Sequence, residues 1–330
     1  MKFAIIGAGW LGCHTAYKLK KKLHKVHLFD QTGIFAGSSL FNQNRLHKGF
    51  HYSRNEKTRK LCKDTFDLFV NDYPDIISEV KNNFYVVPID KSLIDYGTFK
   101  TVFLYEKIPF IESKLSCLTN IEGGLIVDEK YIDPFKAKNF FIHNLQENLH
   151  ISKISSNNLQ TLSKDFDFVI NVTNNVLEPL SECHFELCLT LVYDSLTNLE
   201  FDSITVVDGS FFSIFPYHSS KFTVTDVEHT PIFRSNVYSD IVNYQKNVDE
   251  KFIYNIRTKV EEKIQYYYKD FCKDFKYTSY YTSVKVKKLS KSADRNPIIT
   301  KTDNIISCVT GKIQGIYELE TFINNEITNR

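Results

Sequence analysis

Three glycines that directly follow a short apolar run constrain this chain more than any other feature of its sequence. The residues from Phe3 to Ile6 are all apolar, which is typical of a parallel strand buried on both faces. Gly7 permits a tight turn after this strand, Gly9 lets the backbone approach a pyrophosphate, and Gly12 lets a helix pack closely on the strand. Because the first N–H groups of that helix attract phosphates, the pattern predicts a dinucleotide-binding βαβ unit.

The residues around the glycines complete this unit. Lys25 to Phe29 form a second, mainly apolar run, and Asp30 closes it near the offset of about 20 residues expected for a carboxylate that binds ribose. Trp10 and Leu11 begin the intervening helix, so we expect them beside the cofactor as well. Strand, glycines, helix, strand and acid occur in the expected order, which makes the motif much more specific than the glycines alone.

The segment after the acid bears on which dinucleotide binds. A domain for a nicotinamide dinucleotide would continue with another helix and a third apolar strand. Instead, residues 31–56 are dense in hydrogen-bond donors and aromatic rings, and they are too polar to form a buried strand. This segment therefore argues against a nicotinamide-dependent dehydrogenase.

The overall composition excludes several classes of protein. The 330 residues carry 41 Lys+Arg and 39 Asp+Glu, a balance that gives no global field for nucleic acid or for an anionic membrane. No apolar run approaches the roughly 20 residues that cross a bilayer. The seven cysteines are dispersed without a CxxC pair, so we expect a cytoplasmic location, no disulfide framework and no metal site. The oligomeric state is left open.

The polar segment after Asp30 resembles a known family. Gly37-Ser38-Ser39 and the run from Asn42 to Tyr52 are similar to the FAD-dependent oxidoreductases of the D-amino-acid oxidase superfamily, especially members associated with surface-polysaccharide or sugar biosynthesis. The resemblance implies an α/β fold in which a Rossmann-like FAD-binding domain of the glutathione-reductase type is interleaved with an antiparallel-sheet substrate domain. It also implies FAD as the cofactor and a small-molecule substrate as the partner.

Two later segments extend the resemblance to the middle and the end of the chain. The apolar run that ends at Thr173 looks like the strand beside the pyrophosphate, although Asn174 stands where the family usually has Gly. Gly311 to Gln314 are similar to the loop that returns to the flavin, where a helix N-terminus and Lys312 would stabilise negative charge at the N1–C2 edge. Together, the motif and the resemblance imply cofactor contacts at Gly7, Gly9, Trp10, Leu11, Gly12, Asp30, Gln31, Ser38, Ser39, Asn44, Arg45, Thr173, Gly311, Lys312, Ile313 and Gln314.

The expected domains are discontinuous along the chain. We assign the FAD-binding domain to residues 1–80, 124–175 and 290–330, and the substrate domain to residues 81–123 and 176–289. Alternating β-branched and aromatic residues in the substrate domain predict antiparallel strands, followed by a long helix over about residues 239–273. A sheet that covers the flavin would place the substrate pocket at the domain interface.

Four residues in the donor-rich run are the candidates for chemistry: Arg45, His47, His51 and Tyr52. A guanidinium such as that of Arg45 binds a carboxylate or phosphate in a fork geometry, or supports the flavin itself. His47 or His51 can carry a proton near neutral pH, or can simply satisfy backbone groups.

The expected reaction is the oxidation of a C–N or C–O bond in a small polar substrate, such as an amine, an amino acid or a sugar derivative. In this fold the substrate passes a hydride to flavin N5, while the protein orients the substrate and adjusts charge. Two alternatives remain open at this point: a flavin-dependent sugar mutase with no net redox change, and a dinucleotide-binding scaffold without catalysis.

Overall fold

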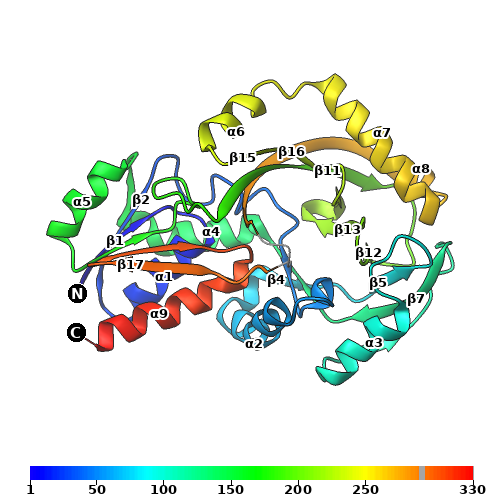
Figure 1. Cartoon of the computed structure of the whole chain (residues 1–330), viewed down its shortest axis with the longest axis horizontal. Helices are drawn as coiled ribbons and strands as arrows, with labels where there is room; N and C mark the ends of the chain where they lie inside the picture. Colours follow the sequence, from blue (N-terminus) through cyan, green and yellow to red (C-terminus); the bar gives the residue numbers. More distant parts are fainter. Residues whose placement is uncertain (290–293, 330) are drawn as a thin grey trace.

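Three β-sheets organise the protein. The computed structural model describes residues 1–289 and 294–329, and the sheets lie within these ranges. Figure 1 shows two lobes: a six-stranded sheet with α1 (Trp10–Lys21) and α9 (Ile316–Thr328) at one end, and a nine-stranded sheet with α7 (Glu250–Tyr267) at the other. Both chain termini lie at the outer end of the first lobe (Figure 1).

The six-stranded sheet is parallel except for one hairpin at its edge. Its strands, in spatial order, are β17 (Ile298–Thr302), β18 (Ile305–Val309), β10 (Phe168–Asn171), β1 (Lys2–Ile6), β2 (Lys25–Asp30) and β9 (Leu149–Ile151), with β17–β18 antiparallel. Phe3 and Ile5 share a core with α1, α4 (Pro134–Leu145) and α9. Ala4 and Ile6 share another core with α5 (Ser156–Asp165). Helices therefore cover both faces, which explains the continuous apolar run at the N-terminus.

The nine-stranded sheet is mostly antiparallel. Its strands are β15 (Pro231–Ser235), β11 (Cys183–Ser195), β14 (Lys221–Asp226), β13 (Phe212–Tyr217), β12 (Ser203–Val206), β5 (Asn83–Pro88), β7 (Ile121–Val127) and β6 (Phe110–Glu112), with β16 (Phe275–Lys288) paired along β11. Its helices are α3 (Tyr96–Tyr105), α6 (Tyr238–Gln245), α7 and α8 (Phe271–Asp274). Leu189 and Leu191 of β11 share a core with Ile253, Val260 and Ile264 of α7, so the apolar stripe of this helix closes the lobe.

A small third sheet joins the two lobes. It contains β3 (Arg45–Leu46), β8 (Lys130–Ile132) and β4 (Ile77–Glu79), and Arg45 is paired with Tyr131 in the register of β3 and β8. The α2 helix (Glu56–Asp72) follows this region. Short 3₁₀ helices occupy Phe50–Tyr52, Pro74–Ile76, Gln146–Asn148, His218–Ser220 and Ile313–Gly315.

The predicted fold class is confirmed, with two corrections of detail. β12 pairs with β5 in parallel, so the second sheet is not wholly antiparallel, because a long crossover rather than a hairpin joins these two strands. The expected helix over 239–273 is divided into α6, α7 and α8. One division falls at Asp249, whose side chain accepts a hydrogen bond from the Phe252 N–H and thereby starts α7 anew.

The domain limits remain a prediction. β7 belongs to the nine-stranded sheet over its whole length, so the limit expected at residue 124 does not coincide with a boundary between sheets. Residues 290–293 and 330 of the third expected FAD-binding segment lie outside the described residues.

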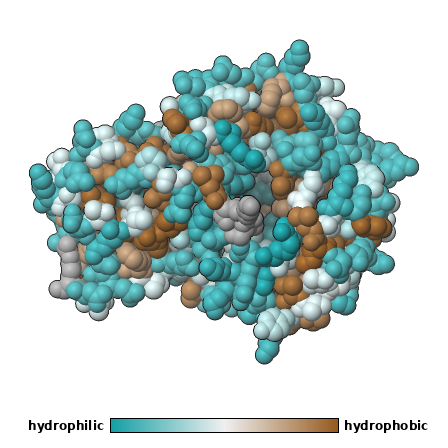
Figure 2. Space-filling view, viewed as in Figure 1, coloured by the Kyte–Doolittle hydropathy of each residue, from teal (hydrophilic) through white to brown (hydrophobic). Residues whose placement is uncertain are grey.

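The described helices include none that is both long enough and apolar enough to span a bilayer. On the face shown in Figure 2, hydrophobic residues are scattered among hydrophilic ones, which cover most of the surface.

Candidate active site

The start of α1 forms a cradle in which side chains have no room. Gly7 has a φ of +106°, in the left-handed region that favours glycine. A Cβ at Gly12 would lie 1.8 Å from the carbonyl oxygen of Gly7, and a Cβ at Gly9 would lie 2.9 Å from Ser39 Oγ. The helix has no side-chain N-cap and no acidic residue in its first turn. Its dipole and N-terminal N–H groups therefore suit an anion such as a pyrophosphate.

The Asp30 carboxylate, expected to bind ribose, is held by the chain itself. Its Oδ2 accepts a hydrogen bond from the Ala8 N–H at 2.8 Å. Its Oδ1 accepts from the Thr32 N–H at 2.8 Å and from the Gly33 N–H at 2.9 Å. Asp30 thus ties the glycine turn to the loop after β2, where Gln31 is exposed. The contact with ribose remains a prediction.

The Trp10 side chain points into the core, away from the cradle. Its ring centroid lies 4.9 Å from that of Phe35 and 5.4 Å from that of Phe69. Leu11 is half-buried and packs against the same core. Only the Trp10 backbone reaches the cradle, where its N–H donates to Ser39 Oγ at 3.0 Å. The side chains of Trp10 and Leu11 therefore contribute packing.

The loop between β2 and β3 is fastened to the second lobe at β16. Ser38 Oγ donates to the carbonyl oxygen of Val284 at 2.6 Å, and the Asn174 amide donates to the same oxygen at 3.4 Å. Asn44 lies further along this loop with a φ of +51°, and its amide donates to the Asn42 carbonyl oxygen at 2.9 Å. Ser38 and Asn44 therefore hold the loop that leads from the cradle to Arg45.

The segment after β10 departs from the expected pattern in residue type but keeps the backbone conformation. Asn174 has a φ of +56°, a conformation that Asn tolerates better than most residues other than Gly. Thr173 Oγ1 donates to Asn171 Oδ1 at 2.8 Å. A Cβ at Gly7 would lie 2.7 Å from the Val172 carbonyl oxygen, so the two turns approach closely without a glycine at 174.

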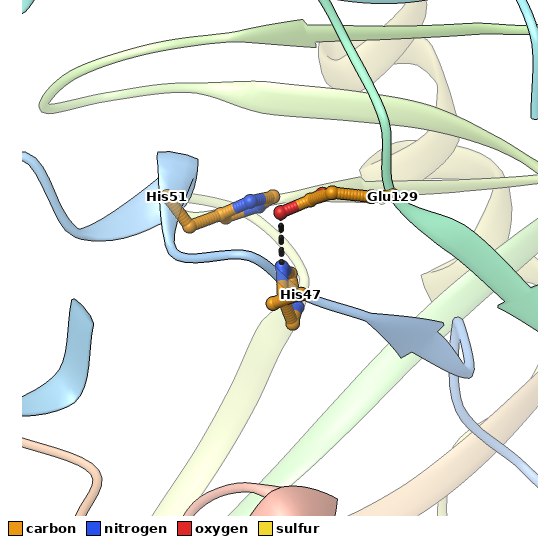
Figure 3. Close-up of side chains that lie close together, drawn as sticks. All are labelled: His47, His51 and Glu129. Carbon is orange, nitrogen blue, oxygen red and sulfur yellow. Dashed lines mark ion pairs between the residues drawn. The ribbon is translucent and has the colours of Figure 1, made fainter. Parts of the chain in front are cut away.

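A second polar group, buried except for the half-buried His51, lies where the third sheet meets the nine-stranded sheet. It contains Arg45, His47, His51, Tyr85 and Glu129, of which Tyr85 and Glu129 are fully buried. Figure 3 shows His51 and Glu129 pointing toward each other, with the His47 ring beside the carboxylate. His47 Nδ1 lies 3.6 Å from Glu129 Oε1, and the two histidine ring centroids are 4.7 Å apart.

The Arg45 guanidinium donates hydrogen bonds to side chains of the nine-stranded sheet. One terminal nitrogen donates to Tyr85 Oη at 2.8 Å, and the other donates to Ser213 Oγ at 2.8 Å and to Ser203 Oγ at 3.3 Å. The guanidinium carbon also lies 3.9 Å from the centre of the Phe215 ring. These contacts place its charge beside the histidines but leave few N–H groups for a substrate. A fork-like contact with a substrate therefore remains only a prediction.

Both histidines are held in the neutral form. Burial lowers the pKa of His47 well below its ordinary value, and the charges of Lys312 and Arg45 lower it further. Burial likewise lowers the pKa of His51, and His47, Arg45 and Lys312 add to the effect. A neutral imidazole has one ring nitrogen free to accept a proton, so either residue can act as a base.

The C-terminal loop brings further positive charge to this group. Burial lowers the pKa of Lys312 to about 7, and its Nζ lies 4.8 Å from the centre of the Tyr52 ring. Burial raises the pKa of Tyr52, and the positive charges of Arg295 and Lys285 lower it in part. The Gln314 amide donates to the His47 carbonyl oxygen at 2.8 Å, which fastens this loop to the histidines.

The remaining residues of the C-terminal loop serve packing. Ile313 is half-buried against the core of the first lobe. A Cβ at Gly311 would lie 2.8 Å from the Arg295 side chain, so the loop passes close to that side chain. The structure thus brings the predicted residues of the loop after β2 and of the C-terminal loop together, although most of their side chains have partners within the chain.

Three of these side chains also have the composition of a metal site. His47, His51 and Glu129 each offer a ligand atom, and these atoms lie within 4.8 Å of one another. However, Glu129 already accepts hydrogen bonds from the Lys48 N–H and from Tyr85, and the positive charges of Arg45 and Lys312 oppose a cation. The arrangement disfavours a metal ion, and the absence of a metal site stays a prediction.

Sequence reasoning missed Tyr85 and Glu129. Glu129 stands between Asp128 and Lys130, a charged run that is typical of a solvated turn. Tyr85 lies in an apolar strand, where the one available clue is that a buried phenol needs a hydrogen-bond partner. Neither Tyr85 nor Glu129 is close in sequence to the histidines beside which it lies.

The cradle at the start of α1 and the polar loop after β2 fit a bound dinucleotide, as expected for the class of the flavin-dependent oxidoreductases. Residues 2–86 match the family model described as FAD dependent oxidoreductase (DAO). FAD-dependent monooxygenase FPY4 of Fusarium mangiferae is 32% identical over 324 residues, which cover 95% of this chain and 87% of that relative. The chain therefore belongs to the FAD-dependent oxidoreductases of the DAO family, with FAD as its cofactor.

Other comparisons agree with this assignment. FAD-dependent monooxygenase kojA of Aspergillus flavus is 26% identical over 356 residues, covering 96% of this chain and 83% of that relative. Glycine oxidase from Geobacillus kaustophilus has the same fold, with a TM-score of 0.70 at 12% identity and coverage of 96% and 90% of the two chains. L-proline dehydrogenase from P. horikoshii gives a TM-score of 0.63 at 12% identity, covering 96% and 89%.

Family membership removes two of the earlier alternatives, a nicotinamide-dependent dehydrogenase and a scaffold without catalysis. The names of the two fungal relatives do not mention sugar biosynthesis, so that part of the resemblance stays a prediction.

Proposed function

We propose that this protein oxidises a C–N or C–O bond of a small polar substrate while either the buried His47 or the half-buried His51 takes up a substrate proton. The observation that carries this proposal is a pair of neutral imidazoles, His47 and His51, surrounded by the positive charges of Arg45 and Lys312. A base beside the charge of Arg45, and beside Lys312 when that lysine is protonated, suits a reaction in which the substrate loses a proton and becomes electron-rich.

The chain's own residues divide this work. The cradle at Gly7, Gly9 and Gly12 would hold the pyrophosphate of FAD, and bound FAD supplies the two-electron acceptor. One histidine takes the proton, and the nearby cations stabilise the electron pair left on the substrate. Burial of the group lowers the local dielectric and strengthens this stabilisation.

The charges also favour a class of substrate. Lys312, Arg295 and Lys285 all contribute positive potential near Tyr52. A substrate that carries a carboxylate, or that forms an enolate or alkoxide on losing its proton, would be favoured in this field. A cationic substrate without an acidic group would be disfavoured.

Monooxygenation is a second candidate, and the names of the two fungal relatives favour it. It would use the same base, because removing a proton from the substrate makes the reacting atom more electron-rich. It would differ in its stoichiometry, since one atom of dioxygen enters the product and an external reductant is consumed. The sugar-ring mutase, which consumes no acceptor, stays the remaining alternative.

One experiment separates these reactions. The FAD-loaded enzyme is incubated with anionic amines, amino acids, sugar acids and enolisable compounds, with and without NADPH, while oxygen uptake and hydrogen peroxide are measured. Oxidation without NADPH and with one peroxide per substrate supports the lead proposal. Incorporation of labelled dioxygen into the product, with NADPH required, supports monooxygenation instead. Product formation without consumption of any acceptor would refute both.

Variants test the role of the histidines. We expect His47→Gln or His51→Gln to lower kcat by roughly 10²–10⁴-fold, the usual contribution of a general base. The exposed His143 of α4 offers a matched control, His143→Gln, which should keep full turnover. Full activity in both the His47→Gln and the His51→Gln variant would overturn the assignment of the pocket.

A further inference from the structure

The hydroxyl of Tyr85 has three hydrogen-bonding neighbours at once. Arg45 donates to it at 2.8 Å, Glu129 Oε2 lies at 2.7 Å, and His51 Nδ1 lies at 2.5 Å. These residues come from β3, the turn after β7 and the 3₁₀ helix at 50–52. A phenol has one proton to donate and two lone pairs to accept with, so three neighbours use its full capacity.

The chemistry of the neighbours fixes the direction of each bond. A guanidinium only donates, and a carboxylate only accepts. Burial raises the pKa of Tyr85 well above its ordinary value, so the phenol keeps its proton. That proton goes to Glu129, one lone pair accepts from Arg45, and the other must accept from His51. His51 therefore carries its own proton on Nδ1.

We propose that Tyr85 and Glu129 are positioning residues that hold His51 as the Nδ1–H tautomer, so that Nε2 is the atom that accepts the substrate proton. This inference rests on the proposed function for the identity of the base and names which histidine and which nitrogen act. Within the described part of the chain, Nδ1 is the ring nitrogen of His51 that has a hydrogen-bond partner. Nε2 is left with its lone pair.

The ring nitrogens of His47 are not held in this way. Its Nδ1 is buried without a hydrogen-bond partner in the described chain and lies 3.6 Å from Glu129 Oε1, beyond hydrogen-bonding distance. Its tautomer is therefore not set by the Tyr85–Glu129 pair. The ring is placed instead through its backbone, where the Gln314 amide donates to the carbonyl oxygen.

The proton transfer balances within this group. The substrate proton moves to His51 Nε2, and the electron pair of the broken bond stays on the substrate. The imidazolium keeps its Nδ1–H bond to Tyr85, whose O–H remains directed at Glu129, so no other proton needs to move. The groups facing His51 are His47, Tyr85, Arg45, Lys312 and Glu129, and of these only Glu129 stabilises the added positive charge.

Glu129→Gln tests the inference because it reverses a bond direction with almost no change in shape. Glu129 Oε1 accepts the Lys48 N–H at 2.8 Å, so the carbonyl oxygen of the new glutamine should take that position. Its NH₂ then faces Tyr85 and donates to it. With two donors against its oxygen, Tyr85 must direct its own proton to His51 Nδ1, which forces the ring into the Nε2–H tautomer.

The measurement is NMR of the FAD-loaded enzyme with isotope-labelled histidine, which reports the protonation of each ring nitrogen. His51→Gln assigns the resonance. We expect the Nδ1–H tautomer in the wild type and the Nε2–H tautomer in Glu129→Gln, with kcat lowered about 10²-fold or more and KM little changed. Tyr85→Phe removes the hydroxyl that accepts from His51 Nδ1–H. The Nδ1–H tautomer should then no longer predominate.

Tyr131→Phe is the matched control, because Tyr131 is buried on β8 and its hydroxyl has no hydrogen-bond partner in the described chain. It should keep the wild-type tautomer and rate. An Nε2–H tautomer in the wild type, or an unchanged tautomer in Glu129→Gln, would overturn the inference. The tautomer is measured without turnover, so an Nδ1–H wild type that oxidises none of the substrates refutes the proposed function and leaves the positioning intact.

Discussion

The glycine cradle allows a prediction in which two physical effects have opposite signs. Gly12 lies within α1, where alanine is the better helix former by roughly 0.5–1 kcal/mol. Helix propensity alone therefore predicts that Gly12→Ala stabilises the protein. Its new Cβ, however, would lie 1.8 Å from the Gly7 carbonyl oxygen, while real Cβ atoms essentially never come closer than 3.0 Å to such an atom.

The size of this clash decides the sign. The helix must move by at least 1.2 Å, the difference between the 1.8 Å separation and the 3.0 Å limit, and the atom in its path is backbone. Overpacking a core typically costs about 1–3 kcal/mol. We expect the destabilisation from this clash to be about 3 kcal/mol or more, because the obstructing atom is backbone. The net destabilisation is then at least about 2 kcal/mol. For a chain of 330 residues, the entropy of unfolding is about 0.7 kcal/mol/K, so Tm falls by about 3 °C or more.

Two assays test this result. Thermal unfolding gives Tm, and ultrafiltration followed by absorbance of the filtrate gives the fraction of FAD retained. We expect Gly12→Ala to lower both, because the displaced helix no longer presents its N-terminus to the pyrophosphate. Gly37→Ala is the matched control, since a Cβ there would meet no atom within 4 Å. A Gly12→Ala variant with wild-type Tm and full FAD content would refute the reasoning.

Three further predictions follow from the site and the core. Arg45→Met should lower kcat/KM by more than tenfold, because the guanidinium charge beside His51 is lost while a side chain of similar volume is kept. Steady-state kinetics check this. Lys312→Met should raise the pKa of His51, since the lysine charge lowers it; the rate requires the unprotonated ring, so the acid limb of the pH–kcat/KM profile should move to higher pH. Trp10→Phe should cost about 1–3 kcal/mol in chemical denaturation yet keep FAD, because that side chain packs in the core; loss of FAD at unchanged stability would contradict this.

The nucleotide-binding half of the site could be predicted from the sequence because its physics is local. Gly7, Gly9 and Gly12 lie within six residues, and each is required by a turn or a close approach within the same βαβ unit. The order of strand, helix and strand follows from residue periodicity alone. Side-chain direction was less certain, as Trp10 shows: the sequence places it at the cradle, whereas packing against Phe35 turns its ring into the core.

The proposed catalytic half depended on contacts that no local pattern records. The loop after β2 marked His47 and His51 as candidates, but did not distinguish between them. Tyr85 and Glu129 reach His51 only because β5 belongs to the second sheet and the turn after β7 lies beside β3. His51 and Tyr85 are 34 residues apart in the sequence, and contacts across such a separation are set by the whole fold.

The sequence by itself thus determined the nucleotide-binding unit, because short-range sterics and periodicity decide it. Its resemblance to a known family indicated the flavin-dependent class and the segment that carries the histidines. The tertiary structure alone decided which polar groups surround His51 and which ring nitrogen holds its proton. The physical reason is that a hydrogen bond has a direction. The direction of the bond between Tyr85 and His51 is set by Arg45 and Glu129, two residues that meet only in the folded chain.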